Sequence, residues 1–233
     1  MIEEYKVVAV ILAAGSATRM KADQNKAFIS IGGIPILART LMVFDEADFV
    51  DEIILVSKAE EIENIRVNIV DNYVKKKEIR IIVGGKERQD SVFNALENID
   101  ERENVLVAIQ DGARPFVKEC WIYESLKAAM EFDGAVVGVA SKDTIKIVEH
   151  GIIKETLDRT KLLNVQTPQS FRLEIIKEAY RRGYYNQVKA TDDSMLVERI
   201  GGQVKYIEGS YDNIKITTPE DLFLAENILK GMK

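Results

Sequence analysis

Two residue types that often carry catalysis or bind metals are nearly absent from this sequence. The 233 residues include one cysteine, Cys120, and one histidine, His150. A single cysteine cannot form an intrachain disulfide, and it excludes cysteine-rich zinc sites. Any mechanism that needs two histidines is excluded, and a Ser-His-Asp triad would have to use His150. Because His150 precedes Gly151 between two alternating stretches, it is typical of an exposed turn.

The sequence also lacks an excess of basic residues and a long hydrophobic run. Its formal net charge is -6 and its pI is about 5.1, which is unfavourable for binding nucleic acid or anionic membranes. The first apolar run, 7–15, is far shorter than the ~20 residues of a membrane-spanning helix. We therefore expect a cytoplasmic protein that binds neither nucleic acid nor membranes. Lysine, arginine, aspartate and backbone amides remain for chemistry, and they suit phosphate groups and magnesium.

Strand-like and helix-like segments alternate along most of the chain. A continuous apolar run rich in β-branched residues predicts a strand at 7–12 that is buried on both faces, and further strands are expected at 53–56, 79–83, 105–109 and 135–139. Helical spacing of apolar residues predicts helices at 35–44, 89–99 and 119–132. Short strands are expected at 204–207 and 213–216, followed by a last helix that Thr218 caps. This alternation predicts one α/β domain over 1–233, with a mostly parallel sheet and helices on both faces.

One segment interrupts the alternation of strands and helices. The stretches 144–149 and 152–157 flank His150 and Gly151, and together they predict a β-hairpin with a short turn. An isolated two-stranded hairpin is at best marginally stable in water. From the pattern alone, the hairpin can pack on a second copy of the chain or fold back onto its own sheet.

Three loops with candidate phosphate ligands are predicted at the carboxyl edge of the sheet, where parallel α/β sheets bind ligands. The first, 12–20, combines small residues with Arg19 and is followed by Lys26; the second, 84–91, begins with two glycines. Small residues let backbone N–H groups approach an anion closely. The third loop, 110–115, contains Asp111, a suitable oxygen ligand for magnesium. Taken singly, each loop could be an ordinary turn, and neither a dinucleotide fingerprint nor a P-loop is present.

Taken together, the motifs resemble one enzyme family over nearly the whole chain. The motifs are, in chain order, Leu12-Ala13-Ala14-Gly15, Arg19-Met20, Asn25-Lys26, Gly84-Gly85-x-x-Arg88-x-x-Ser91, Asp111-Gly112-Ala113-Arg114-Pro115, Asp143-Thr144-Ile145-Lys146, Gln166-Thr167-Pro168-Gln169, Thr191-Asp192-Asp193 and Asn213-Ile214-Lys215. This set resembles the 2-C-methyl-D-erythritol 4-phosphate cytidylyltransferases of the non-mevalonate isoprenoid pathway. The resemblance implies a Rossmann-like three-layer nucleotidyltransferase fold, with a β-hairpin arm protruding at 143–158.

The resemblance also implies a reaction and a set of residue roles. CTP and 2-C-methyl-D-erythritol 4-phosphate would give 4-diphosphocytidyl-2-C-methyl-D-erythritol and pyrophosphate, with Mg²⁺ or another divalent cation bound at Asp111. Catalysis is assigned to Arg19, Lys26, Arg159 and Lys215. Nucleotide binding is assigned to Ala13, Ala14, Gly15, Ser16, Gly85, Ser91, Asp111 and Gly112. Substrate binding is assigned to Arg114, Thr144, Arg159, Thr167 and Thr191. The family is a homodimer whose arm reaches the neighbour's active site, which favours the dimeric interpretation of the hairpin.

Two alternative functions stay open beside this one. A ribitol-5-phosphate cytidylyltransferase would share the nucleotide half and differ in the alcohol pocket. A catalytically silent nucleotide-binding regulator should have lost Arg19, Lys26, Asp111 or Lys215, yet all four are present. A nicotinamide-dependent dehydrogenase is disfavoured, because the glycine fingerprint that it requires is missing.

Overall fold

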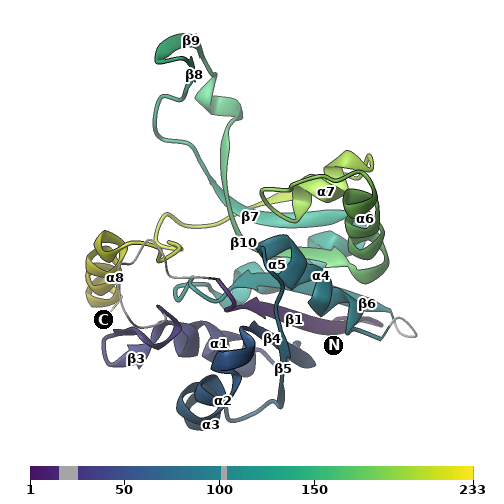
Figure 1. The fold of residues 1–233 in the computed structure, drawn as a ribbon, viewed down its shortest axis with the longest axis vertical. Coiled ribbons are helices and arrows are strands. Elements are labelled where there is room, and N and C mark those ends of the chain that lie inside the picture. Colours follow the sequence, from purple (N-terminus) through teal and green to yellow (C-terminus); the bar gives the residue numbers. More distant parts are fainter. Residues whose placement is uncertain (16–25, 101–103, 233) are drawn as a thin grey trace.

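A seven-stranded sheet lies at the centre of the molecule (Figure 1), with the strand order β11-β7-β10-β6-β1-β4-β5. The computed structural model describes residues 1–15, 26–100 and 104–232. β10 is antiparallel to both of its neighbours, and the other paired strands are parallel. The strands are β1 (Lys6–Leu12), β4 (Glu52–Ser57), β5 (Ile79–Val83), β6 (Val105–Asp111), β7 (Gly134–Ala140), β10 (Leu163–Arg172) and β11 (Val204–Glu208).

Helices cover both faces of this sheet. They are α1 (Ile36–Glu46), α2 (Ile62–Ile65), α3 (Asp71–Tyr73), α4 (Arg88–Glu97), α5 (Glu119–Glu131), α6 (Leu173–Tyr185) and α7 (Ser194–Arg199). A further helix, α8 (Pro219–Gly231), lies to the side of this sheet (Figure 1). Shorter helical turns are η2 (Lys26–Phe28), η3 (Ala59–Glu61), η4 (Arg66–Val70) and η5 (Arg159–Lys161). Among the described residues, no helix is both long enough and apolar enough to cross a membrane.

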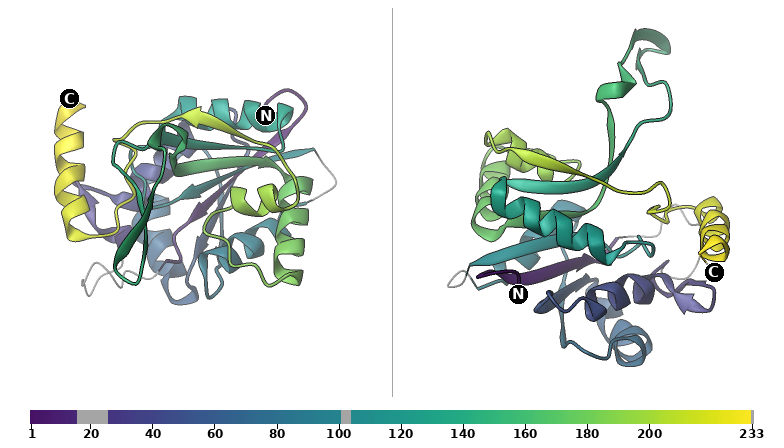
Figure 2. Two further views of the ribbon diagram at one scale, coloured as in Figure 1. Left: turned by 90° about the horizontal axis from the view of Figure 1, so that it is seen from above. Right: turned by 180° about the vertical axis from the view of Figure 1, so that it is seen from behind.

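Strand β1, an interior strand of the sheet, shows why three layers form. Val7, Ala9 and Ile11 pack with α1 and α5 on one face, and Val8 and Val10 pack with α4, α6 and α7 on the other. Successive side chains of a strand point to opposite faces, so a strand that is apolar at every position has to be covered on both sides. The expected fold class is confirmed: the sheet is mostly parallel, with helices on both faces (Figure 2).

The C-terminal part of the chain differs from the sequence prediction at one strand. The prediction of a strand at 213–216 is wrong, because this segment pairs with no strand of the structure. Individual hydrogen bonds hold it in place instead, such as the one from Ile216 N to Ala113 O at 2.9 Å. Beyond it, Thr218 and Asp221 form the capping box at the start of α8, which confirms the predicted helix start. α8 packs over the small sheet of β2 (Ser30–Ile31) and β3 (Ile34–Pro35).

The predicted hairpin forms a separate two-stranded sheet. β8 (Lys146–Glu149) and β9 (Ile152–Thr156) pair with each other and with no strand of the central sheet. Figures 1 and 2 show this arm extending away from the body of the molecule, between the end of β7 and the start of β10. All residues of both strands are exposed. The alternative in which the hairpin folds back onto its own sheet is therefore wrong.

Candidate active site

The loops after β1 and β6 lie side by side at the carboxyl edge of the sheet. The backbone N–H of Ala13 donates to Val56 O at 2.8 Å, and that of Gly112 donates to Leu12 O at 2.9 Å. A Cβ atom on Gly112 would lie 2.9 Å from this same carbonyl oxygen, so glycine permits the close approach. This contact brings together two of the three loops that were predicted to meet at one edge of the sheet.

The loop at 84–91 approaches the same place. Gly85 N donates to Ser91 Oγ at 3.1 Å, and this hydroxyl donates to Glu87 O at 3.1 Å. The small residues lie close enough that a Cβ atom on Gly84 would be 2.7 Å from Ala14 Cβ. Three of the candidate nucleotide ligands, Ala14, Gly85 and Ser91, are thus brought together from distant parts of the sequence.

Asp111, the last residue of β6, is surrounded by cations. Its Oδ2 atom lies 2.9 Å from Lys215 Nζ and 3.4 Å from Arg114 Nε, and its Oδ1 atom lies 3.6 Å from Arg88 Nε. Burial of this side chain, which is 9% exposed, would raise the pKa of Asp111. The three facing cations outweigh that effect, so the pKa of Asp111 lies well below its ordinary value and the group is a carboxylate.

A polar network places Lys215 at this carboxylate. Asn213 O accepts a hydrogen bond from Arg114 Nη1 at 2.7 Å, and Asn213 Nδ2 donates to Thr167 O at 3.0 Å. Thr167 in turn accepts, through Oγ1, a bond from the backbone N of Asp111 at 3.1 Å. The irregular segment that carries Lys215 is therefore fixed against both β10 and the Arg114 loop. Two candidate substrate ligands, Arg114 and Thr167, lie beside Asp111.

A divalent cation fits this site only together with a phosphate ligand. Asp111 supplies hard carboxylate oxygen, but no group of three or more histidine, cysteine, aspartate or glutamate side chains could hold a metal within the described ranges. Magnesium commonly binds one or two carboxylates and completes its coordination with water and substrate phosphates. The donor set therefore suits a metal that is bound together with a nucleotide.

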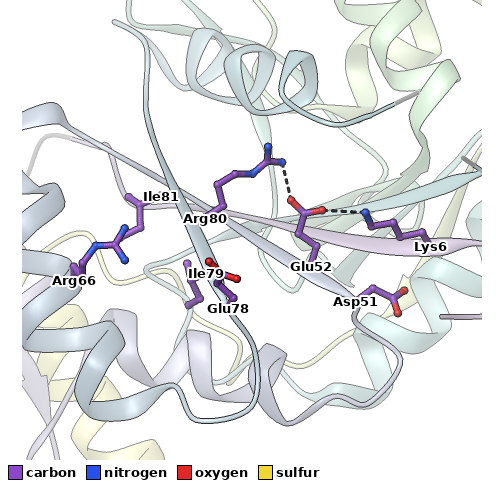
Figure 3. A pocket seen from close by; sticks show the side chains of 8 residues that line it. All are labelled: Lys6, Asp51, Glu52, Arg66, Glu78, Ile79, Arg80 and Ile81. Atoms are coloured by element: carbon purple, nitrogen blue, oxygen red, sulfur yellow. Dashed lines mark hydrogen bonds and ion pairs between the residues drawn. The ribbon is translucent and has the colours of Figure 1, made fainter. Parts of the chain in front are cut away.

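A cavity of about 560 Å³ lies at the opposite edge of the sheet (Figure 3). It contains Lys6, Glu52 and Ile79, the first residues of β1, β4 and β5. Lys6 Nζ and Arg80 Nη2 pair with Glu52 at 3.2 and 2.7 Å. Basic and acidic residues are equal in number here, so the lining has no excess positive charge for a phosphate. The full lining is Lys6, Asp51, Glu52, Arg66, Glu78, Ile79, Arg80 and Ile81.

Comparison with known proteins agrees with the chemistry of the carboxyl edge. The family model for 2-C-methyl-D-erythritol 4-phosphate cytidylyltransferase (IspD) matches residues 7–231. The chain belongs to this family. It is accordingly a CTP-using cytidylyltransferase of isoprenoid biosynthesis, and the function expected from the sequence motifs is confirmed.

Individual relatives match along nearly the whole length of this family member. A 2-C-methyl-D-erythritol 4-phosphate cytidylyltransferase of Clostridioides difficile (strain 630) is 50% identical over 224 residues, covering 96% of this chain and 94% of that protein. The 4-diphosphocytidyl-2C-methyl-D-erythritol synthase of Anaerococcus prevotii DSM 20548 has a similar structure, with a TM-score of 0.86, 34% identity and 98% of each chain covered. The corresponding cytidylyltransferase of Thermus thermophilus gives a TM-score of 0.74 at 29% identity, covering 95% of this chain and 98% of that one.

Some residues assigned from the family pattern are not among the described residues that contact Asp111. Thr144 lies on the exposed hairpin arm and Arg159 begins η5 directly after it, where Arg159 Nη1 donates to Lys142 O at 2.9 Å. Thr191 is exposed, and its hydroxyl lies 3.7 Å from Met195 Sδ. Ser16 and Arg19 lie outside the described residues, as does the side chain of Lys26. Thr144 and Arg159 therefore lie on or directly beside the arm rather than in the cluster that this chain forms around Asp111.

The sequence motifs gave no role to two residues that the structure places at the site. Arg88 lies against Asp111, and it also pairs with Asp193 through Nη2 and Oδ2 at 2.7 Å. Both residues stand within the quoted motifs, but the motifs do not show that the two side chains pair with each other. A bond between residues 105 positions apart leaves no periodic signal in a sequence.

Proposed function

We propose that the carboxyl edge of the sheet carries out cytidylyl transfer by in-line displacement. A phosphate oxygen of 2-C-methyl-D-erythritol 4-phosphate attacks the α-phosphorus of CTP and forms a new P–O bond. The bond from the α-phosphorus to the oxygen that bridges the α- and β-phosphates breaks, and pyrophosphate leaves with that electron pair. One observation carries this proposal: the buried carboxylate of Asp111 lies against Lys215, Arg114 and Arg88, where three loops meet.

The proposed nucleophile needs no general base. A phosphate monoester has a second pKa of about 6, so it is largely a dianion at neutral pH. The difficulty is instead electrostatic, because an anion must approach the polyphosphate of CTP. Positioned cations and a metal ion lower that repulsion and hold the reacting groups in line. This requirement agrees with a site rich in lysine and arginine, and with a sequence whose one histidine stands in the hairpin turn.

The charges at Asp111 are arranged for this task. Lys215, Arg114 and Arg88 supply three positive charges, against the two negative charges of Asp111 and Asp193. One positive charge is in excess before Arg19 and Lys26 are added. We assign Lys215, Arg19 and Lys26 to the α-phosphate during transfer. Ala13, Ala14, Gly15, Ser16, Gly85, Ser91, Asp111 and Gly112 are assigned to the nucleotide.

Asp111 is the residue assigned to magnesium or another divalent cation. When bound, the metal supplies positive charge to the nucleotide phosphates. Lys215 Nζ lies 2.9 Å from Asp111 Oδ2 in the free protein and, with a metal on this carboxylate, would interact with the phosphates instead. Asp111 thus holds Lys215 near its working position in the free protein, which spares the site a large rearrangement on binding.

The exposed arm supports a homodimer in which each subunit completes the other's site. Large apolar side chains on the arm are strongly exposed: Val148 by 55%, Ile152 by 63% and Ile153 by 60%. Large apolar side chains exposed to this extent favour an interaction site, and a lone hairpin gains little stability by itself. We assign the phosphate of the alcohol substrate to Arg114, Thr167 and Thr191 of one subunit and to Thr144 and Arg159 of its neighbour. The assembly then consists of one cytidylyltransferase domain over 1–233 per subunit, with the arm at 143–158 exchanged.

Pyrophosphate release from CTP and Mg²⁺ tests the assigned substrate directly. We expect release with 2-C-methyl-D-erythritol 4-phosphate and none with ribitol 5-phosphate, measured side by side on the same preparation. Release only with ribitol 5-phosphate would keep the chemistry of the nucleotide half and overturn the assignment of the alcohol site. Silence with both substrates, in folded protein that binds CTP, would overturn the catalytic assignment.

A further inference from the structure

Arg88 joins two carboxylates that come from different parts of the fold. It is the first residue of α4 and directly follows the loop at 84–87. Its Nη1 and Nη2 atoms donate to Asp193 Oδ1 and Oδ2 at 2.8 and 2.7 Å, which is a bidentate pair. Its Nε atom lies 3.6 Å from Asp111 Oδ1. A single guanidinium therefore connects the end of β6 with the start of α7.

Asp193 depends on this pairing because its side chain is fully buried. A buried carboxylate is costly unless hydrogen bonds and an opposite charge compensate for the lost water. Here Arg88 supplies the charge, and Tyr180 supplies a further bond, from its hydroxyl to Asp193 Oδ1 at 2.6 Å. The backbone at Asp193 is consequently fixed relative to α4 and α6.

The rest of the segment 191–194 is held from the side of β10. Gln169 Oε1 accepts hydrogen bonds from the backbone N–H groups of Asp193 and Ser194, both at 3.1 Å. Gln169 Nε2 donates to Asp192 Oδ2 at 3.0 Å. Thr191, which has been assigned to the alcohol substrate, comes immediately before this anchored stretch. Its distance from Asp111 is thus set by β10 on one side and by Arg88 on the other.

We propose that Arg88 is a positioning residue: it holds the Thr191 segment in register with Asp111, so that the alcohol phosphate meets the nucleotide in line. The proposal rests on the roles assigned above to Thr191 and Asp111. Arg88 acts through these two residues and forms no contact with substrate of its own.

The two pairings explain why arginine rather than lysine is required at position 88. The planar guanidinium donates two parallel bonds to Asp193 and still presents Nε toward Asp111. A lysine ammonium is a compact point charge that can neutralise Asp193 but cannot span both carboxylates in this geometry. Arg88→Lys therefore keeps a cation beside the buried Asp193 while it removes the bridge.

Arg88→Lys is the test variant, and Arg80→Lys is its matched control. Arg80 also donates to a carboxylate, Glu52, at 2.7 Å, but it lies at the far edge of the sheet (Figure 3). For Arg88→Lys we expect kcat/KM for 2-C-methyl-D-erythritol 4-phosphate to fall about 10- to 100-fold, the loss typical of a small displacement of reacting groups. CTP affinity, measured by calorimetry without the alcohol, should stay within about threefold of the wild-type value. This is less than the tenfold change in affinity that corresponds to about 1.4 kcal/mol of binding free energy. Arg80→Lys should match the wild type in both measurements.

A double-mutant cycle with Thr191→Ala separates positioning from simple support of the fold. If Arg88 acts through Thr191, the second substitution adds little to the kcat/KM loss of Arg88→Lys, because residues in one network are not additive. Fully additive losses, or an Arg88→Lys enzyme with unchanged kcat/KM, would overturn the positioning role and leave the proposed function intact. If Thr191→Ala alone leaves kcat/KM for the alcohol unchanged, the assignment of Thr191 under the proposed function fails instead.

Discussion

At the scale of single residues, Lys215 offers the most direct test of the site. Lys215→Ala removes one cation from Asp111, whose carboxylate keeps Arg88 and Arg114 as partners, so the fold should persist. Loss of one preorganised charge costs about 3–4 kcal/mol in the transition state, so we expect kcat to fall roughly 10²–10³-fold. Lys205→Ala is the control, because Lys205 lies on β11 with its Nζ over the Phe132 ring. Near-normal turnover by folded Lys215→Ala enzyme would contradict the assigned role.

The same loss is expected for Arg19→Ala and for Lys26→Ala. Both cations are assigned to the α-phosphate, where the reaction gathers negative charge, and each should contribute about 3–4 kcal/mol, or roughly 10²–10³-fold in rate. Steady-state turnover together with a thermal unfolding curve for each purified variant provides the measurement. A variant that unfolds like the wild type and also turns over at a comparable rate would show that its cation has no part in transfer.

The pH dependence of the reaction should report the substrate rather than Asp111. Burial raises the pKa of Asp111, but Lys215, Arg88 and Arg114 together bring it below its ordinary value. Because the folded pKa is below the unfolded value of about 3.9, this group stabilises the fold above that pH and loses its contribution only as the pH falls further. We therefore expect the acid limb of kcat/KM to lie near pH 6, at the second pKa of the monoester, which is about 6. A limb that differs from the pKa found by phosphorus NMR titration of the free substrate would contradict this.

Residue types in the motifs revealed which side chains matter, but not how they pair. Asp111 and Lys215 could be selected because strand ends and family motifs marked them. Arg88 stood in a motif without a role, since its partner Asp193 belongs to a segment that only the fold brings near. Pairings between distant side chains depend on tertiary geometry, which a linear pattern does not contain.

At the scale of the elements, the turn after β6 determines where Asp111 lies. A Cβ atom on Gly112 would lie 2.8 Å from Leu37 Cδ1 and 2.9 Å from Leu12 O, so Gly112→Ala forces the turn away from β1. Overpacking of this kind costs about 1–3 kcal/mol, and we expect that loss of unfolding free energy in urea, together with reduced turnover. Gly231→Ala is the control, since nothing lies within 4 Å of its Cβ position in α8. Equal urea midpoints for Gly112→Ala and wild type would contradict the argument.

The elements that sequence reasoning recovered differ in kind from those it missed. β1, β4, β6 and β7 contain continuous apolar runs, and β5 is an apolar stretch that Arg80 interrupts. The structure confirms each of the five strands within about two residues, the usual uncertainty of element boundaries. β10 was missed because Pro168 and polar residues such as Gln166 and Gln169 break the strand pattern. Those polar side chains are buried because they fix the Thr191 and Asn213 segments, so the missed strand is also one that builds the site.

At the scale of the whole molecule, the alternation of strands and helices was sufficient to predict the layered sheet. It could not decide the place of the hairpin, because an alternating pattern shows which residues pair but not which surface covers them. The structure excludes packing of the arm on its own sheet and leaves its apolar residues exposed. Arg159 and Asp111 are separated within one chain. The proposed homodimer accounts for this separation by placing Arg159 of one subunit at the site of the other.

Subunit complementation gives the sharpest test of that assembly. One subunit carries Arg159→Ala, and the other carries Lys215→Ala; different affinity tags allow the mixed dimer to be purified. If Arg159 acts on the neighbour's site, the mixed dimer contains one site with an intact core and an intact partner arm, and it should show about half of wild-type turnover. Each variant alone should stay near background, because every site then lacks one of the two cations. If Arg159 serves its own subunit, both sites of the mixed dimer are defective, and a mixed dimer at background would overturn arm exchange.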